Sequence, residues 1–209
     1  MTNVAPFKAI PIDSSGSPKW GSWVYGHCTL GPLSRASTIS GPDCTEIPIC
    51  FETLCRFTGV YSGNVGIYEQ DLVYRNGTFG VVECYLVPNP NGDFNHVYKI
   101  RWYGCNSNLY TDDLSYWSDM VTVVGNVYEP RWCEFMNIYC TYDRNSTLYP
   151  DFVRYGYDKN SDSLFTVIHG DELPKGYTDR GISWINKSEF IRRLFDRYGI
   201  GGYIKNEES

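Results

Sequence analysis

The sequence has fewer basic than acidic residues and no long apolar run. Its 18 Lys and Arg residues are outnumbered by 24 Asp and Glu, and the formal net charge is -6. Because a negative chain repels phosphate, nucleic acid and anionic membrane surfaces are not expected partners. No apolar run approaches the roughly 18 residues that cross a bilayer, so we expect no membrane span.

Motifs of known catalytic chemistry are also missing. The chain has no Gly-x-Ser-x-Gly elbow, no His-Glu-x-x-His and no glycine-rich phosphate loop leading into a helix. There are only three histidines, His27, His96 and His169, and none stands in a pattern typical of a catalytic base. We therefore expect a non-catalytic protein without a cofactor or a metal.

The eight cysteines contain no Cys-x-x-Cys pair and have no histidine at zinc-finger spacing. An even number of scattered cysteines predicts disulfides in an oxidising compartment, and buried free thiols in the cytosol are the alternative. The N-terminus as given carries no secretory signal, so we expect an extracellular protein whose signal has been removed. The predicted disulfide cysteines are Cys28, Cys44, Cys50, Cys55, Cys84, Cys105, Cys133 and Cys140.

Three sequons agree with that compartment, at Asn76, Asn145 and Asn186. Chance alone gives roughly two sequons in a chain this rich in Asn, Ser and Thr, so their weight is small. They predict glycosylation at these three positions.

The pattern of prolines and apolar residues divides the chain into two parts. Residues 1–56 hold six prolines and four of the eight cysteines. Because proline removes backbone donors, we expect an irregular N-terminal region, stapled by disulfides, that packs on the main body. Residues 57–209 are expected to form an antiparallel β domain with one C-terminal helix.

Strand-like runs separated by short turns fill most of the second part. In 96–102, Tyr98, Ile100 and Trp102 share one face, and Lys99 and Arg101 share the other. Asn91-Gly92 is a strong turn signal before it. The fold class is therefore mostly β, an antiparallel barrel or sandwich. The predicted strands are 57–61, 79–87, 96–102, 119–128, 131–142, 151–157 and 163–170.

A helix over 187–198 ends the domain. Asn186 is a good N-cap, with Glu189 at the capping-box position, and Gly199 supplies a left-handed stop. Apolar residues recur through the segment at helical spacing. If Asn186 caps the helix, a glycan at that residue competes with the cap.

Aromatic residues on or beside the strands are the candidate ligand-binding residues. An eight-stranded barrel can hold one small apolar ligand, and in that case these rings would line its site. The alternative is that they fill a core. The candidates are Trp102, Tyr103, Trp117, Trp132 and Tyr139.

Residues 57–200 resemble a lipocalin. Phe57-Thr58-Gly59-Val60-Tyr61 looks like the Gly-x-Trp start of that family, with Tyr61 in place of Trp. "ECYL" (83–86) and "YKIRW" (98–102) are similar to the branch that contains the xanthophyll de-epoxidases. The resemblance implies a barrel with an apolar pocket and transfers no catalytic residue.

Two functions from different classes follow. The first is a secreted or surface-exposed recognition glycoprotein domain, of viral or parasite type, that binds a protein receptor or a glycan through exposed tyrosines and loops. The second is a lipocalin-like carrier of a small apolar ligand. An enzyme of the de-epoxidase type is a further alternative, and it would need a carboxylate inside the pocket.

Overall fold

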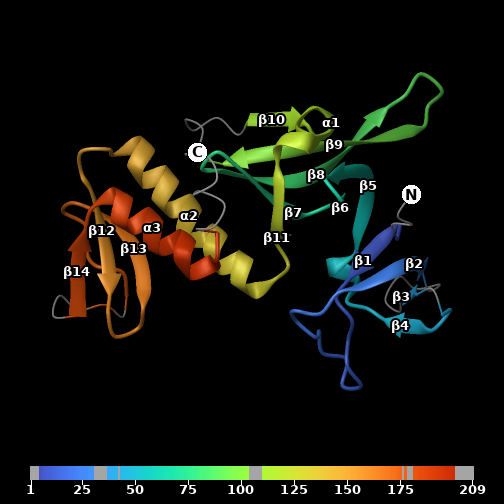
Figure 1. The fold of residues 1–209 in the computed structure, drawn as a ribbon, viewed down its shortest axis with the longest axis horizontal. Coiled ribbons are helices and arrows are strands. Elements are labelled where there is room, and N and C mark those ends of the chain that lie inside the picture. The colour runs from blue at the N-terminus through green and yellow to red at the C-terminus, as the bar shows by residue number, and fades with distance from the viewer. Residues whose placement is uncertain are drawn as a thin grey trace. The chain divides into compact units, whose positions relative to one another are not determined.

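The computed structural model describes residues 5–30, 37–41, 43–103, 110–175, 177 and 181–200 (Figure 1). The chain divides into two compact units. The first unit comprises Met1–Arg75, Phe79–Trp102 and Thr111–Pro130, and the second comprises Asn76–Thr78, Tyr103–Tyr110 and Arg131–Ser209. The prediction of a mostly β protein with antiparallel sheets is confirmed, and the sheets have a half-barrel curl.

One sheet of the first unit contains the N-terminal segment. Its strand order is β4-β3-β2-β1-β5-β6, and the neighbours are antiparallel. The segment that we expected to be irregular thus contributes four strands of this sheet within the described residues. The strands are β1 (Phe7–Ala9), β2 (Val24–Leu30), β3 (Ser37–Ser40), β4 (Glu46–Pro48), β5 (Cys55–Ser62) and β6 (Val65–Tyr68), with a short 3-10 helix at Phe51–Thr53.

A second sheet of the first unit has the order β10-β9-β8-β7-β11. Two predicted strands and the turn between them are confirmed here: β8 and β9 flank Asn91-Gly92, and Gly92 has a φ of 86°. A short helix α1 (Leu114–Trp117) and a 3-10 turn (Ser118–Met120) precede the last strand. The strands are β7 (Asp71–Arg75), β8 (Thr78–Pro88), β9 (Phe94–Tyr103), β10 (Tyr110–Asp113) and β11 (Thr122–Asn126).

The two sheets of the first unit share a hydrophobic core. The predicted alternation in β9 is confirmed, because Ile100 and Trp102 are buried and Tyr98 packs against the same cluster. Side chains of β6, β7 and β8 complete it. Burying large aliphatic and aromatic side chains contributes roughly 1.5–3 kcal/mol for each one, so this cluster is a main source of the unit's stability.

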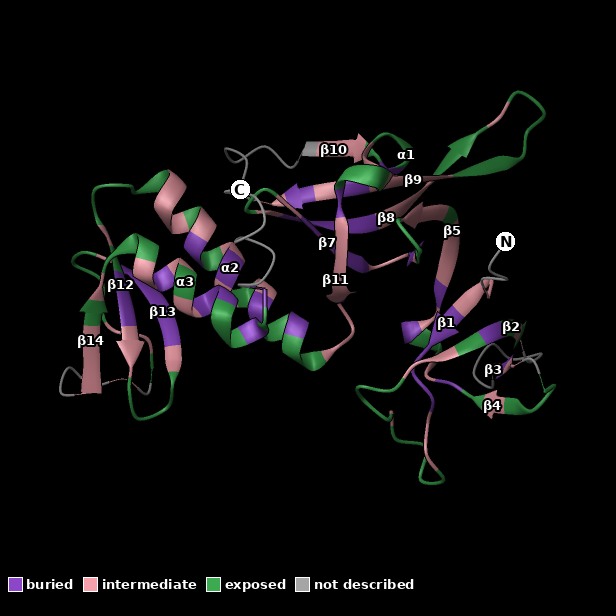
Figure 2. Cartoon of the chain, viewed as in Figure 1, coloured by how far each residue is buried: buried purple, intermediate pink, exposed green. Residues whose placement is uncertain are grey.

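The second unit is a small sheet covered by two helices. The sheet has the order β13-β12-β14, with β12 at Val153–Asp158, β13 at Ser163–Ile168 and β14 at Ile182–Ile185. The Tyr155 ring of β12 packs at a tilt against Tyr142 of α2 (Pro130–Leu148) and Phe190 of α3 (Lys187–Tyr198). Figure 2 shows buried residues on both helices and on β12 and β13.

Helix α2 corrects one prediction, since residues 131–142 were expected to be a strand. The segment is rich in aromatic and β-branched residues, which favour strands. Its buried residues, however, are Trp132, Phe135, Tyr139 and Tyr142, at spacings of three, four and three. This is the period of a helix, and Pro130 at the first helical position is compatible with a helix start.

Helix α3 has the predicted bounds, 187–198. The Asn186 side chain accepts a hydrogen bond from the Glu189 backbone N–H at 2.8 Å, and Gly199 ends the helix with a φ of 73°. The Glu189 carboxylate contacts Arg192 and Arg193. The cap and the stop are therefore confirmed.

The predicted disulfide stapling has no support in the described part of the chain. Cys28, Cys44, Cys50, Cys55, Cys84 and Cys133 are free thiols, and Cys105 lies outside the described residues. Two of these thiols form hydrogen bonds with polar groups and no disulfide with another cysteine. Cys55 donates to the Thr53 carbonyl at 3.3 Å and accepts from the Asn126 side chain, and Cys50 donates to Glu52.

Candidate binding pocket

Two of the predicted ligand-binding residues lie in the core of the first unit. The rings of Trp102 and Trp117 meet edge to face, with centroids 5.8 Å apart. Trp102 is 7% exposed, and the Trp117 Nε1–H group donates to Asp112. The Arg75 guanidinium lies 4.1 Å from the Trp117 ring. Both rings thus make packing contacts within the unit.

The other candidates belong to the second unit. Trp132 and Tyr139 are buried in α2, where both pack on Phe135. Tyr139 also lines a pocket of about 460 Å³ beside α2 and α3. Tyr103 is at the end of β9. Of the five candidates, Tyr139 is the one that lines the pocket beside α2 and α3.

A larger pocket, of about 750 Å³, lies in the first unit and was not predicted from the sequence. This volume is in the range of ligand-binding pockets, about 300–1,000 Å³. Its walls come from β1, β2, β6 and β11 and the segments beside them. Lining residues with polar or aromatic side chains are Lys8, Trp23, Tyr25, His27, Ser40, Tyr68, Asp71 and Glu129.

An ion pair is buried in the wall of this pocket. The Lys8 Nζ atom lies 2.5 Å from Asp71 Oδ1, and the side chains are 8% and 1% exposed. A buried charge without a partner costs several kcal/mol, so each of the two residues makes the burial of the other tolerable. The pair joins β1 to β7, and hence the two sheets of the unit.

Asp71 has further hydrogen-bond donors around its carboxylate. Oδ1 also accepts from the Asn126 side chain at 2.9 Å, and Oδ2 accepts from the Tyr68 backbone N–H at 2.8 Å. Burial raises the pKa of Asp71 above its usual value, while the contacts with Lys8, Asn126 and Tyr68 act in the opposite direction. With three donors the carboxylate is a fixed structural group.

Two aromatic rings face the Lys8 ammonium. Its Nζ atom is 4.8 Å from the ring centroid of Trp23 and 4.8 Å from that of Tyr68. The negative ring faces attract a cation within about 6 Å. Among the described residues, Asp71 is the one hydrogen-bond acceptor of Lys8. The two rings are further groups that stabilise the Lys8 charge.

The same aromatic side chains form the wall of the pocket. Tyr25 packs edge to face on Tyr68, with centroids 5.9 Å apart, and is 47% exposed. The Tyr68 hydroxyl donates to the Ala5 carbonyl, and burial raises the pKa of Tyr68 to about 12. Both hydroxyls therefore stay neutral near pH 7, and the rings offer apolar faces with polar edges.

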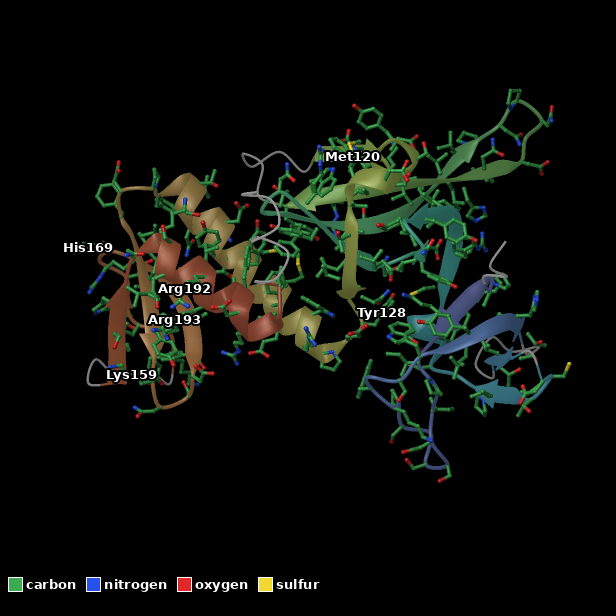
Figure 3. The ribbon with its side chains drawn as sticks, in the orientation of Figure 1. Met120, Tyr128, Lys159, His169, Arg192 and Arg193 are labelled. Carbon is green, nitrogen blue, oxygen red and sulfur yellow. The ribbon has the colours of Figure 1, made fainter. Side chains whose placement is uncertain are left out.

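Glu129 brings a negative charge to the pocket. Its Oε1 atom accepts a hydrogen bond from Trp23 Nε1–H at 3.1 Å, across 106 positions of the sequence. Glu129 has no ion-pair partner among the residues that the structure describes. It follows Tyr128 in the segment after β11 (Figure 3).

Local backbone features shape two of the walls. A Cβ atom on Gly26 would lie 2.0 Å from the Ser40 carbonyl oxygen, so a side chain there would push β2 and β3 apart. The pairing of β11 with β7 shifts between Val123 and Gly125, as at a β-bulge. Val124 is the additional residue and lines the pocket.

The histidines are placed in three different settings. His27 lines the pocket and is exposed, whereas His96 shares a hydrogen bond with Arg56 at 2.6 Å. His169 follows β13 in the second unit (Figure 3). The described residues contain no group of three or more His, Cys, Asp or Glu side chains that could hold a metal.

The three sequon asparagines also differ in their surroundings. Asn76 is exposed, with a φ of 45°, in the two-residue turn between β7 and β8. The Asn145 Nδ2 group, to which a glycan would be attached, donates to Thr166 at 2.8 Å. Asn186 caps α3.

Sequence reasoning missed the pocket residues Lys8, Asp71 and Trp23. The available signal was a lone charge in a buried apolar run, as with Lys8 in "FKAI" and Asp71 in "DLVY". Charged residues are rarely buried without a partner, so such positions indicate an internal pair. The sequence does not show that Lys8 and Asp71 are partners, because they are 63 positions apart.

Within the described residues, no helix is long and apolar enough to cross a bilayer. Comparisons with protein-family models, with curated proteins and with solved structures found no match to this chain.

Proposed function

We propose that the protein is a non-catalytic recognition module that binds a protein receptor or a glycan through the pocket of its first unit. The observation that carries this proposal is an open pocket with an aromatic wall over a buried ion pair. Aromatic faces supply contact area at a low entropic cost, and a few charged groups give orientation and specificity.

Two further observations support recognition over transport of an apolar ligand. The shared core of the first unit is filled by its own side chains, among them Trp102 and Trp117. Aromatic side chains are exposed elsewhere, including Trp20 at 53% and Tyr116 at 69%. The charges of Lys8 and Asp71 would also penalise a purely apolar ligand.

An enzyme is the second candidate. An enzyme of the de-epoxidase type would need a carboxylate inside the pocket, and Asp71 is such a carboxylate. The three donors around Asp71 hold its oxygens in place. A carboxylate used in proton transfer needs an oxygen within reach of the substrate. The arrangement therefore favours binding over catalysis.

The predicted extracellular location and the use of the sequons stay part of the proposal. The disulfide framework that motivated the location has no support in the described residues. The exposed turn at Asn76 is compatible with a surface glycoprotein.

A screen with paired variants tests the binding proposal. The wild type, Trp23→Ala and Trp20→Ala would be assayed on a glycan array and on a library of receptor ectodomains. Trp23 lines the pocket and Trp20 does not, although Trp20 is exposed. We expect Trp23→Ala to weaken binding about tenfold or more, as at an interface hot spot, and Trp20→Ala to have little effect.

Thermal unfolding of each variant separates lost binding from lost folding. A bound ligand whose affinity is the same in wild type and in folded Trp23→Ala would show that the pocket is not the binding site. A screen that yields no ligand for the wild type would count against the recognition function itself.

A further inference from the structure

The charges around the pocket indicate more than a general binding site. Lys8 and Asp71 neutralise one another at 2.5 Å. Of the Asp, Glu, Lys and Arg side chains in the lining, Glu129 then contributes the remaining formal charge. The pocket therefore has a net negative charge, in a chain whose total charge is also negative.

The surroundings of Glu129 leave its charge available to a ligand. One oxygen accepts from the Trp23 indole, which fixes the carboxylate beside the ring. Among the residues that the structure describes, no Lys, Arg or His side chain forms an ion pair with it. A half-buried carboxylate next to an aromatic wall favours a cationic group.

The pocket already binds one cation in this way. The Lys8 ammonium lies 4.8 Å from the ring centroids of both Trp23 and Tyr68, with Asp71 as its counter-ion. The pocket lining has further groups of the same kinds, since Tyr25 is 47% exposed and Glu129 accepts a hydrogen bond from Trp23. The groups around Lys8 thus indicate that Glu129, Trp23 and Tyr25 suit a second cation.

We propose, building on the recognition function above, that the pocket binds a basic group of its partner. The group is an ammonium, as in a lysine side chain or an amino sugar, with Glu129 as its counter-ion and the rings of Trp23 and Tyr25 around it. Because Asp71 neutralises Lys8, the Lys8 ammonium does not repel a second cation from the pocket.

Matched probes test this charge preference and distinguish the two sources. Nα-acetyl-lysine amide and its neutral norleucine counterpart form one pair, and glucosamine and N-acetylglucosamine form the other. Affinities would be measured by following the Trp23 indole signal in NMR titrations at low and high salt. In one of the two pairs, we expect the charged member to bind about tenfold more tightly than the neutral member, and that pair identifies the source of the ammonium. High salt should weaken the binding of the charged member.

Glu129→Gln provides the test at the residue. Glutamine keeps an acceptor for the Trp23 indole and removes the charge, so the preference for the charged probe should disappear. Glu46→Gln, at an exposed position of β4 outside the pocket, should leave it unchanged. Thermal unfolding confirms that both variants fold.

The outcomes separate this inference from the proposed function. If charged and neutral probes bind equally, or if no probe binds while a ligand from the screen requires Trp23, the basic-group inference is wrong and the recognition pocket stands. A preference for the charged probe that survives Glu129→Gln also overturns the inference. If neither probes nor screen yields a Trp23-dependent ligand, both proposals fail.

Discussion

The Nζ atom of Lys8 lies 2.5 Å from Oδ1 of Asp71, with 7% and 0% of the two residues exposed. These residues are 63 positions apart and belong to different sheets of the same unit. The pair therefore fixes the two sheets to each other in the wall of the pocket.

Removing one partner of this pair should be strongly destabilising. Lys8→Met leaves Asp71 buried without its counter-charge, and we expect it to cost about 3–5 kcal/mol in the free energy of unfolding, measured in urea. Lys8→Met combined with Asp71→Asn should cost less than the sum of the single variants. Lys19→Met, at an exposed position, is the control, with a change within about 0.5 kcal/mol. Additive costs would show that the pair does not interact energetically.

The Cys55 thiol should make stability depend on pH in the alkaline range. Burial raises the pKa of Cys55 from 9.0 to about 12. The resulting stabilisation is fully present below pH 9 and is lost as pH rises towards 12, at roughly 1.4 kcal/mol per pH unit. In this pH range, the free energy of unfolding of Cys55→Ala should fall less steeply with pH than that of the wild type. Equal slopes for wild type and Cys55→Ala would contradict the assignment.

Thiol labelling should follow exposure. Cys44 and Cys133 are exposed and Cys55 is buried. In the native, unreduced protein, we expect an alkylating reagent to label the first two rapidly and Cys55 only after unfolding. Peptide mass spectrometry identifies the labelled positions. Resistance of Cys44 and Cys133 until a reductant is added would instead support the disulfide framework predicted from the sequence.

The N-cap of α3 should contribute measurably to stability. Asn186→Ala removes the acceptor for the Glu189 N–H group and should cost about 1 kcal/mol in the free energy of unfolding. Asn186→Ser keeps a side-chain acceptor and should recover most of that loss. Equal unfolding midpoints for the alanine and serine variants would mean that the cap is energetically silent.

Local signals predicted the elements whose pattern is contained in a short segment. Helix α3 was found from Asn186, the apolar stripe and Gly199, all within 14 residues. Helix α2 is harder to predict because its aromatic residues also favour strands, and only the spacing of its buried residues, at three, four and three, indicates a helix.

The pocket could not be predicted, because its groups meet only in the folded chain. Lys8 meets Asp71, and Trp23 meets Glu129, across 63 and 106 positions. A position on or beside a strand does not by itself separate an aromatic ring in the core from one that lines a pocket. Trp102 and Trp132 fill cores, and Trp23 lines the pocket.

The most direct test of the recognition pocket uses the six tryptophan indole groups as reporters in an NMR titration with the tightest ligand from the screen. The proposed site predicts that the Trp23 indole resonance shifts in proportion to occupancy, while the resonances of Trp102 and Trp132 stay in place. A shift of the Trp132 or Trp184 resonance, with that of Trp23 unchanged, would place the ligand in the second unit and contradict the account.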